Sequence, residues 1–171
     1  MERLIRTIPY ENDTDSFPQI PEFKRAMPTK VVYVRERIYA VGDSSRSYAS
    51  MGFTVCSGFV FKDKKGINFG LFHAVPMQDL YPNDFKNLKT LAGGQVILIE
   101  GSASIPSPRI LSDLEQKLGI KHTGTIRVDT RRPQVGNMHF HVAFRPKTDE
   151  ILVARNSHKD LLIYSGFKLL F

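Results

Sequence analysis

The sequence predicts an α+β fold, a single domain of layered, mixed β-sheets with few helices. The length of 171 residues suits one domain. Most apolar segments are short, rich in β-branched and aromatic residues, and bounded by glycine, proline or polar turns. Few segments have helical spacing. The composition, 42% hydrophobic and 24% charged, is ordinary for a globular protein, so a core of useful size is expected.

The N-terminal half predicts an arm followed by strands. Residues 1–30 contain several prolines and no sustained period, which predicts an irregular arm before a domain spanning 31–171. Residues 31–41 (VVYVRERIYAV) predict one strand, and the polar residues 42–50 predict a loop. Residues 51–61 (MGFTVCSGFVF) predict a second continuous strand.

A hairpin turn is expected at residues 63–66 (DKKG), because polar residues ending in glycine separate two apolar runs. Residues 67–75 (INFGLFHAV) then form the returning strand. In that strand Phe69, Leu71 and His73 have the same parity, so they share one face.

The C-terminal half predicts helices and further strands. Residues 77–92 indicate one short helix, and the glycine pair 93–94 precedes a buried strand, 95–101. Ile110, Leu114 and Leu118 have helical spacing, with Gly119 as a natural stop. Four more strands are expected in 123–130, 137–146, 151–155 and 161–167. The apolar tail, 161–171, predicts an edge strand and a plug for the core.

Charge and cysteine content limit the function classes. The net charge of +7 permits nucleic acid, a membrane surface or an acidic protein as partner, although the positive residues are scattered. One cysteine excludes an intramolecular disulfide and a thiolate-rich zinc site. No apolar stretch of membrane-spanning length and no signal-peptide pattern occurs, which favours a cytoplasmic location.

A basic binding module is the non-enzymatic alternative. Arg127, Arg131 and Arg132 could contact phosphates, and Tyr10 and Tyr48 could stack on bases. No nucleic-acid-binding motif organises these residues, so nucleic acid is an unfavoured partner.

The only cysteine, Cys56, and His73 lie at similar distances on either side of the predicted turn. Antiparallel pairing about this turn would bring the two side chains close together. An imidazole beside a thiol can take its proton and make sulfur a nucleophile. Equally, Cys56 could be a small core residue and His73 a satisfied core histidine.

The segment around this pair resembles the CheD family of chemoreceptor glutamine deamidases. The matching pieces are Val55–Gly58, Gly66–Gly70 and His73–Pro76. Downstream, residues 93–94, 101–120 and 144–155 follow in the family's order. This family is part of a Cys–His deamidase superfamily that includes cytotoxic necrotizing factor-like toxin domains.

The resemblance implies hydrolysis of a protein-bound glutamine to glutamate and ammonia. Cys56 would be the nucleophile and His73 the general base and acid. The family places a threonine six residues before the cysteine to orient the histidine; this sequence has Ser50 there, and Thr54 is a second candidate. No cofactor is expected, because the thioester route needs only thiol, base and water. The same acyl chemistry extends to glutamate methyl esters.

The implied partner is a protein with an exposed glutamine, either a cytoplasmic chemoreceptor, with a CheC-type regulator, or a host protein modified by a secreted effector. A zinc-binding YfiH-like hydrolase is a further alternative. His139 and His141 are spaced to share a strand face, and Cys56 or His73 could complete a metal site with them.

Overall fold

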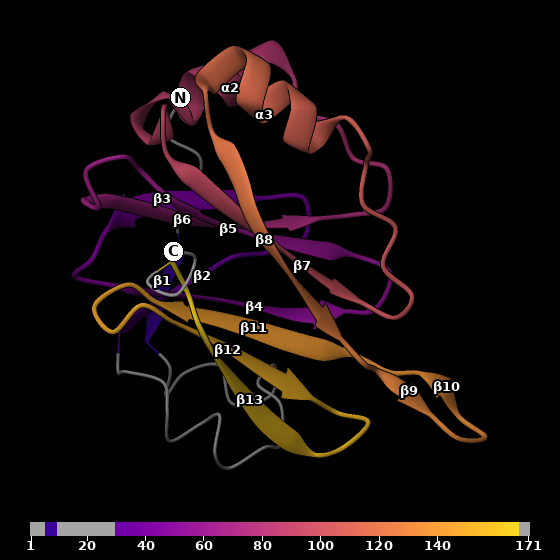
Figure 1. Ribbon diagram of the computed structural model, residues 1–171. Helices are drawn as coiled ribbons and strands as arrows, with labels where there is room; N and C mark the ends of the chain where they lie inside the picture. Colours follow the sequence, from indigo (N-terminus) through magenta and orange to yellow (C-terminus); the bar gives the residue numbers. More distant parts are fainter. Residues whose placement is uncertain (1–5, 10–29, 168–171) are drawn as a thin grey trace.

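The computed structural model describes residues 6–9 and 30–167 and contains two packed β-sheets with helices over one of them. The first sheet, here sheet 1, has the strand order β1-β2-β4-β11-β12-β13. The second, sheet 2, has the order β3-β6-β5-β7-β8. Figure 1 shows α2 and α3 over the outer face of sheet 2, with sheet 1 on its other side.

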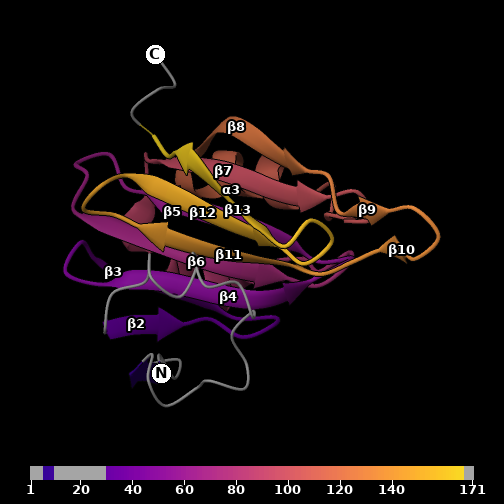
Figure 2. The same ribbon diagram turned by 90° about the horizontal axis from the view of Figure 1, so that it is seen from below.

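The elements are short, as the sequence predicts. Sheet 1 contains β1 (Arg6–Pro9), β2 (Lys30–Tyr33), β4 (Ser47–Phe53), β11 (Phe140–Arg145), β12 (Glu150–Arg155) and β13 (Asp160–Ser165). Sheet 2 contains β3 (Tyr39–Asp43), β5 (Ser57–Lys62), β6 (Asn68–Ala74), β7 (Gln95–Gly101) and β8 (Lys121–Val128). The helices are α2 (Pro82–Asn87), the 3-10 turn η2 (Lys89–Leu91) and α3 (Ile110–Leu118). A small ribbon of β9 (Arg131–Arg132) and β10 (Gly136–Asn137) projects from one end (Figure 2).

Both sheets are mixed. β2 pairs parallel with β4, and β7 pairs parallel with β8, while the other pairs within the two sheets are antiparallel. The prediction of layered mixed sheets with few helices is therefore confirmed. The predicted arm, 1–30, lies mostly outside the described residues, although β1 within it pairs with β2.

Two apolar layers fill the space between the elements. The layer between the sheets includes Phe53, Val60 and Leu71 together with Phe140 and Phe144. The layer between sheet 2 and the helices includes Phe59, Phe61, Phe72, Leu88 and Leu114. Alternate residues of β5 and β6 therefore point to opposite layers, because successive side chains of a strand face opposite ways. His73 has the parity of Leu71 and faces the layer between the sheets.

The predicted single strand over residues 31–41 is wrong. The chain leaves sheet 1 after β2, turns through Arg37 with φ 67°, and enters sheet 2 as β3. Apolar residues lie on both sides of this crossing, so the run looks continuous in the sequence. The charged residues Arg35, Glu36 and Arg37 mark the crossing and are exposed.

The predicted strand over residues 51–61 is also two strands. β4 ends at Phe53 in sheet 1, and β5 begins at Ser57 in sheet 2. The loop predicted over 42–50 is wrong from Ser47 onward, because β4 begins there. Small residues such as Ala49 and Ser50 have little strand propensity, but β4 is an interior strand, paired with β2 and β11.

The other element predictions are confirmed. The 63–66 turn joins β5 to β6, with Gly66 at φ 69°, and Asp63 accepts hydrogen bonds from the backbone of Ile67 and the side chain of Asn68. Helix α3 ends at Gly119, whose φ is 63°. β13 is the edge strand of sheet 1, and Phe167 is buried edge-on to Phe144. The rest of the predicted core plug, residues 168–171, lies outside the described residues. Among the described residues, no helix has the length and apolarity to cross a membrane.

Candidate active site

The two crossings between the sheets bring four polar side chains together. Glu36 lies on the first crossing and Cys56 on the second. Ser50 projects from β4 of sheet 1, and His73 from β6 of sheet 2. The site therefore forms where the inner faces of the sheets meet, beside the apolar layer that contains Cys56.

Ser50 fixes the orientation of the His73 ring. The Ser50 Oγ lies 2.7 Å from His73 Nδ1 and 2.5 Å from the carbonyl oxygen of Val34. A carbonyl only accepts, so the single hydroxyl proton of Ser50 goes to Val34. Ser50 Oγ must then accept the Nδ1–H of His73. This assigns the tautomer in which Nε2 carries a free lone pair.

Phe53 covers one face of the His73 ring. The two rings stack with centroids 3.8 Å apart and an angle of 11° between their planes. Space for the phenyl ring comes from Gly58, which pairs with His73 across β5 and β6. A Cβ at Gly58 would lie 3.4 Å from the Phe53 ring. The imidazole is thus held by a hydrogen bond at its edge and by a ring on its face.

Cys56 and Glu36 complete the group. A ring nitrogen of His73, the Cys56 Sγ and a Glu36 carboxylate oxygen all lie within 4.8 Å of one another. The thiol donates to Glu36 Oε1 at 3.7 Å, a long contact for a sulfur donor. Cys56 is 3% exposed and His73 is fully buried, whereas Glu36 is exposed. Glu36 therefore connects the buried thiol with a solvent-exposed side chain.

Both members of the Cys–His pair are neutral at rest. Burial, and then the charge and hydrogen bond of Glu36, raise the pKa of the Cys56 thiol to about 11. Burial lowers the pKa of His73 to about 4. The Nε2 atom of His73 is buried without a hydrogen-bond partner. A buried polar atom without a partner is costly, and a catalytic role or a bound water or ion would explain it.

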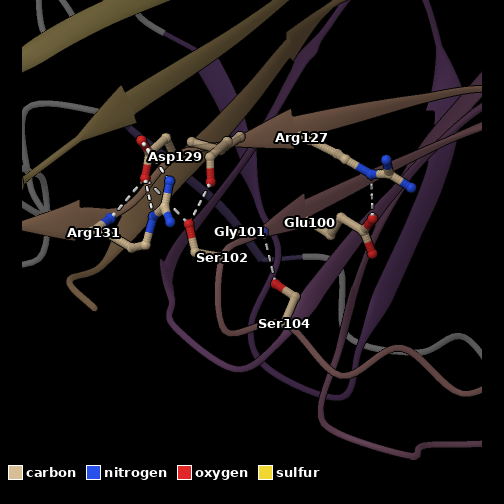
Figure 3. A pocket seen from close by; sticks show the side chains of 8 residues that line it. Glu100, Gly101, Ser102, Ser104, Arg127, Asp129 and Arg131 are labelled. Atoms are coloured by element: carbon tan, nitrogen blue, oxygen red, sulfur yellow. Dashed lines mark hydrogen bonds and ion pairs between the residues drawn. The ribbon is translucent and has the colours of Figure 1, made fainter. Parts of the chain in front are cut away.

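The backbone on the far side of Cys56 is also fixed. The Ser104 hydroxyl donates to the Cys56 carbonyl oxygen at 2.6 Å, and the Ile105 N–H donates to Val55 O at 2.9 Å. Ser104 also lines an open depression of about 410 Å³ (Figure 3). The other lining residues are Glu100, Gly101, Ser102, Arg127, Val128, Asp129 and Arg131. The second crossing is therefore tied directly to a wall of this depression.

The structure separates the two hydroxyl candidates. Ser50 contacts His73, while Thr54 Oγ1 lies 2.6 Å from Nδ1 of the exposed His139. Thr54 is on the second crossing but bonds outward, toward the residue preceding β11. Its placement does not support the alternative that Thr54 orients His73.

The His139–His141 pair does not form a metal group in the described part of the chain. His141 Nδ1 accepts the Gly52 N–H at 3.1 Å, so its Nε2–H donates to Asn156 Oδ1 at 3.2 Å. Both nitrogens of His141 are therefore occupied. The group of potential metal ligands within the described ranges is Glu36, Cys56 and His73.

Sequence reasoning missed Glu36. The signal was present, because Arg35, Glu36 and Arg37 interrupt an otherwise apolar run. Charged residues at that place argued for a break in the predicted strand. Their sequence spacing, however, did not predict that Glu36 contacts Cys56, because Cys56 lies in a different apolar run.

No protein-family model matches this chain, and no curated protein matches its sequence.

Glu36→Gln should lower the pKa of the Cys56 thiol, because the substitution removes the carboxylate charge while the burial remains. Each unit of decrease raises the thiolate fraction at pH 8 about tenfold. Alkylation by iodoacetamide between pH 6 and 11, with a chelator present, measures this shift. Glu100→Gln, which alters a carboxylate paired with Arg127, is the matched control. An unchanged alkylation midpoint in Glu36→Gln would contradict the assignment.

Proposed function

We propose that this protein is a cysteine-dependent protein glutamine deamidase with a CheD-like domain. The observation that carries the proposal is the Ser50–His73 hydrogen bond of 2.7 Å, with Cys56 beside the same imidazole. A hydroxyl that fixes the tautomer, an imidazole with a free lone pair and a thiol are the parts of a nucleophilic acyl-transfer site. The family resemblance gives the same three residues the same roles.

The proposed reaction has two steps. The Cys56 sulfur attacks the side-chain carbonyl carbon of a glutamine while His73 Nε2 takes the thiol proton. The carbon–nitrogen bond then breaks, and His73 returns the proton to the departing ammonia. A water molecule, deprotonated by His73, hydrolyses the thioester and releases glutamate and the free thiol. These two reaction steps need no redox partner and no cofactor.

Burial and Glu36 together account for the protonated resting state of Cys56. Burial raises the pKa of the thiol, and the Glu36 carboxylate, which accepts the thiol proton in a hydrogen bond, raises it further. The NH₂ group of a carboxamide is a good donor to a carboxylate. A bound glutamine side chain that donates to Glu36 would release the thiol toward His73. The nucleophile would then become active only when an amide is present.

A protein partner also fits the charge distribution. The net charge of +7 favours association with an acidic protein surface. Arg127 and Arg131, expected to contact phosphates in a binding module, each have a carboxylate oxygen at 3.1 Å, from Glu100 and Asp129. These pairs neutralise the local positive charge and weigh against a nucleic-acid surface. Tyr48, expected to stack on bases, is 1% exposed and cannot do so, and Tyr10 lies outside the described residues. A cytoplasmic chemoreceptor or a host protein carries the target glutamine in this proposal.

The proposal is tested with a cell lysate in ¹⁸O-labelled water. The wild-type protein should convert specific glutamines to glutamates that contain one labelled oxygen, because water supplies the new carboxylate oxygen. Mass spectrometry identifies the modified sites. Cys56→Ser should produce none above background. Glutamine conversion that is equal in wild type and Cys56→Ser, or absent from both, would overturn the proposal.

A further inference from the structure

We propose that Glu36, Cys56 and His73 form a binding site for a thiophilic divalent cation, with Zn²⁺ the best match. One carboxylate oxygen, one thiol sulfur and one imidazole nitrogen lie within 4.8 Å of one another. Sequence spacing suggested a zinc site elsewhere, at His139 and His141, but the structure uses both nitrogens of His141 in hydrogen bonds.

The ligand set suits zinc. Zinc binds sulfur at about 2.3 Å and nitrogen or oxygen at about 2.0 to 2.2 Å, in a tetrahedron. Ligand atoms in such a tetrahedron lie roughly 3.3 to 3.7 Å apart. The Cys56 Sγ and Glu36 Oε1 are 3.7 Å apart. Glu36 is exposed at a chain crossing, so its side chain is free to adjust to the ion.

His73 presents the lone pair that a metal needs. Ser50 accepts the Nδ1–H, so the free lone pair is on Nε2, which is buried and has no hydrogen-bond partner. A metal-binding histidine usually donates its other ring N–H to an oxygen acceptor that fixes the ring and its tautomer, and the Ser50 hydroxyl oxygen supplies that acceptor here. The unpartnered, fully buried nitrogen is the observation that distinguishes this group from an ordinary surface cluster.

The charges of the site balance. As the sulfur–metal bond forms, Cys56 gives its proton to water and becomes a thiolate. One thiolate and one carboxylate then neutralise the two positive charges of the ion. A neutral complex suits a site in which Cys56 and His73 are buried, because an unbalanced buried charge is costly. Three protein ligands leave the fourth position to water.

Metal occupancy would also control the thiol. A metal-bound thiolate is a weaker nucleophile, because the ion withdraws electron density from the sulfur, and the bound ion also occupies the His73 lone pair that would take a proton, so the ion would act as a reversible inhibitor. This consequence rests on the proposed deamidase function, whereas metal binding itself does not.

The experiment is a spectroscopic titration of the full chain with Co²⁺, followed by competition with Zn²⁺. Wild type should bind one equivalent and show a thiolate-to-cobalt charge-transfer band that zinc removes. The band should be lost in Cys56→Ser. Glu36→Gln, a change to an exposed side chain, should weaken binding by about 10- to 100-fold. His139→Ala and His122→Ala, which alter exposed histidines, are the matched controls and should bind as wild type.

The outcomes separate the two proposals, because the spectrum requires no activity. Absence of the charge-transfer band in wild type, or equal affinity in Glu36→Gln and wild type, overturns the metal site. Loss of binding in His139→Ala overturns it in favour of the histidine pair. Binding without any deamidation leaves the metal site standing and removes the proposed function. Deamidation that Zn²⁺ does not inhibit removes the regulatory consequence.

Discussion

Ser50→Ala should lower kcat for glutamine deamidation by about 10²- to 10⁴-fold, the range seen when a residue that fixes a catalytic histidine tautomer is altered. Without the hydroxyl, nothing described selects the Nδ1–H form, and the lone pair on Nε2 is no longer assured. The change also leaves Val34 O without the hydroxyl donor, at a cost of about 1 to 3 kcal/mol of stability. Steady-state kinetics, combined with the ¹⁵N chemical shifts of the His73 ring, measure both effects.

Two further variants make this prediction specific. Ser50→Thr keeps the hydroxyl and should retain most of the activity. Thr54→Val should retain activity, because Thr54 bonds His139 and not His73. A larger loss in Thr54→Val than in Ser50→Ala would show that the wrong hydroxyl has been assigned.

Acidification should destabilise the protein strongly between pH 6.5 and pH 4. Burial lowers the pKa of both His73 and His141 from 6.5 to about 4. The unfolded chain therefore binds more protons than the folded chain in this window, and stability falls as the pH falls. At pH 5 the loss is about 2 kcal/mol for each histidine relative to pH 7.

Urea unfolding of the metal-free protein at pH 7 and pH 5 measures this loss. His141→Asn should make the pH dependence shallower, because one of the two buried histidines is gone. His122→Ala, which changes an exposed histidine, should leave the pH dependence as in wild type. Equal free energies of unfolding at the two pH values would contradict the burial of both imidazoles as uncharged groups.

Local sequence patterns predicted most of the elements but not the path between the sheets. The 63–66 turn, α3 and β11 to β13 were predictable, because each depends on periodicity and turn residues within one segment. The two crossings were not predictable. Apolar residues precede and follow each crossing, so each run looks like one continuous strand. The alternation of buried and exposed side chains along a strand does not indicate which of the two sheets the strand joins.

The candidate site was predictable to the extent that it depends on one hairpin. Cys56 and His73 are near each other because β5 and β6 pair about a short turn, with Gly58 opposite His73. Ser50 was reached only through the family resemblance, and Glu36 was not reached at all. Their proximity depends on packing one sheet against the other, which no local pattern encodes.

The Ser50–His73 hydrogen bond joins a strand of sheet 1 to a strand of sheet 2, which ties the chemistry of the site to the docking of the two sheets. A displacement of one sheet against the other by about 1 Å would stretch this bond beyond hydrogen-bond length. In an intermediate with both sheets formed but not yet packed, Cys56 would also lose its burial between the sheets, so its thiol would have the pKa and reactivity of an ordinary exposed cysteine. The alkylation rate of Cys56 during refolding would then report when sheet 1 packs against sheet 2.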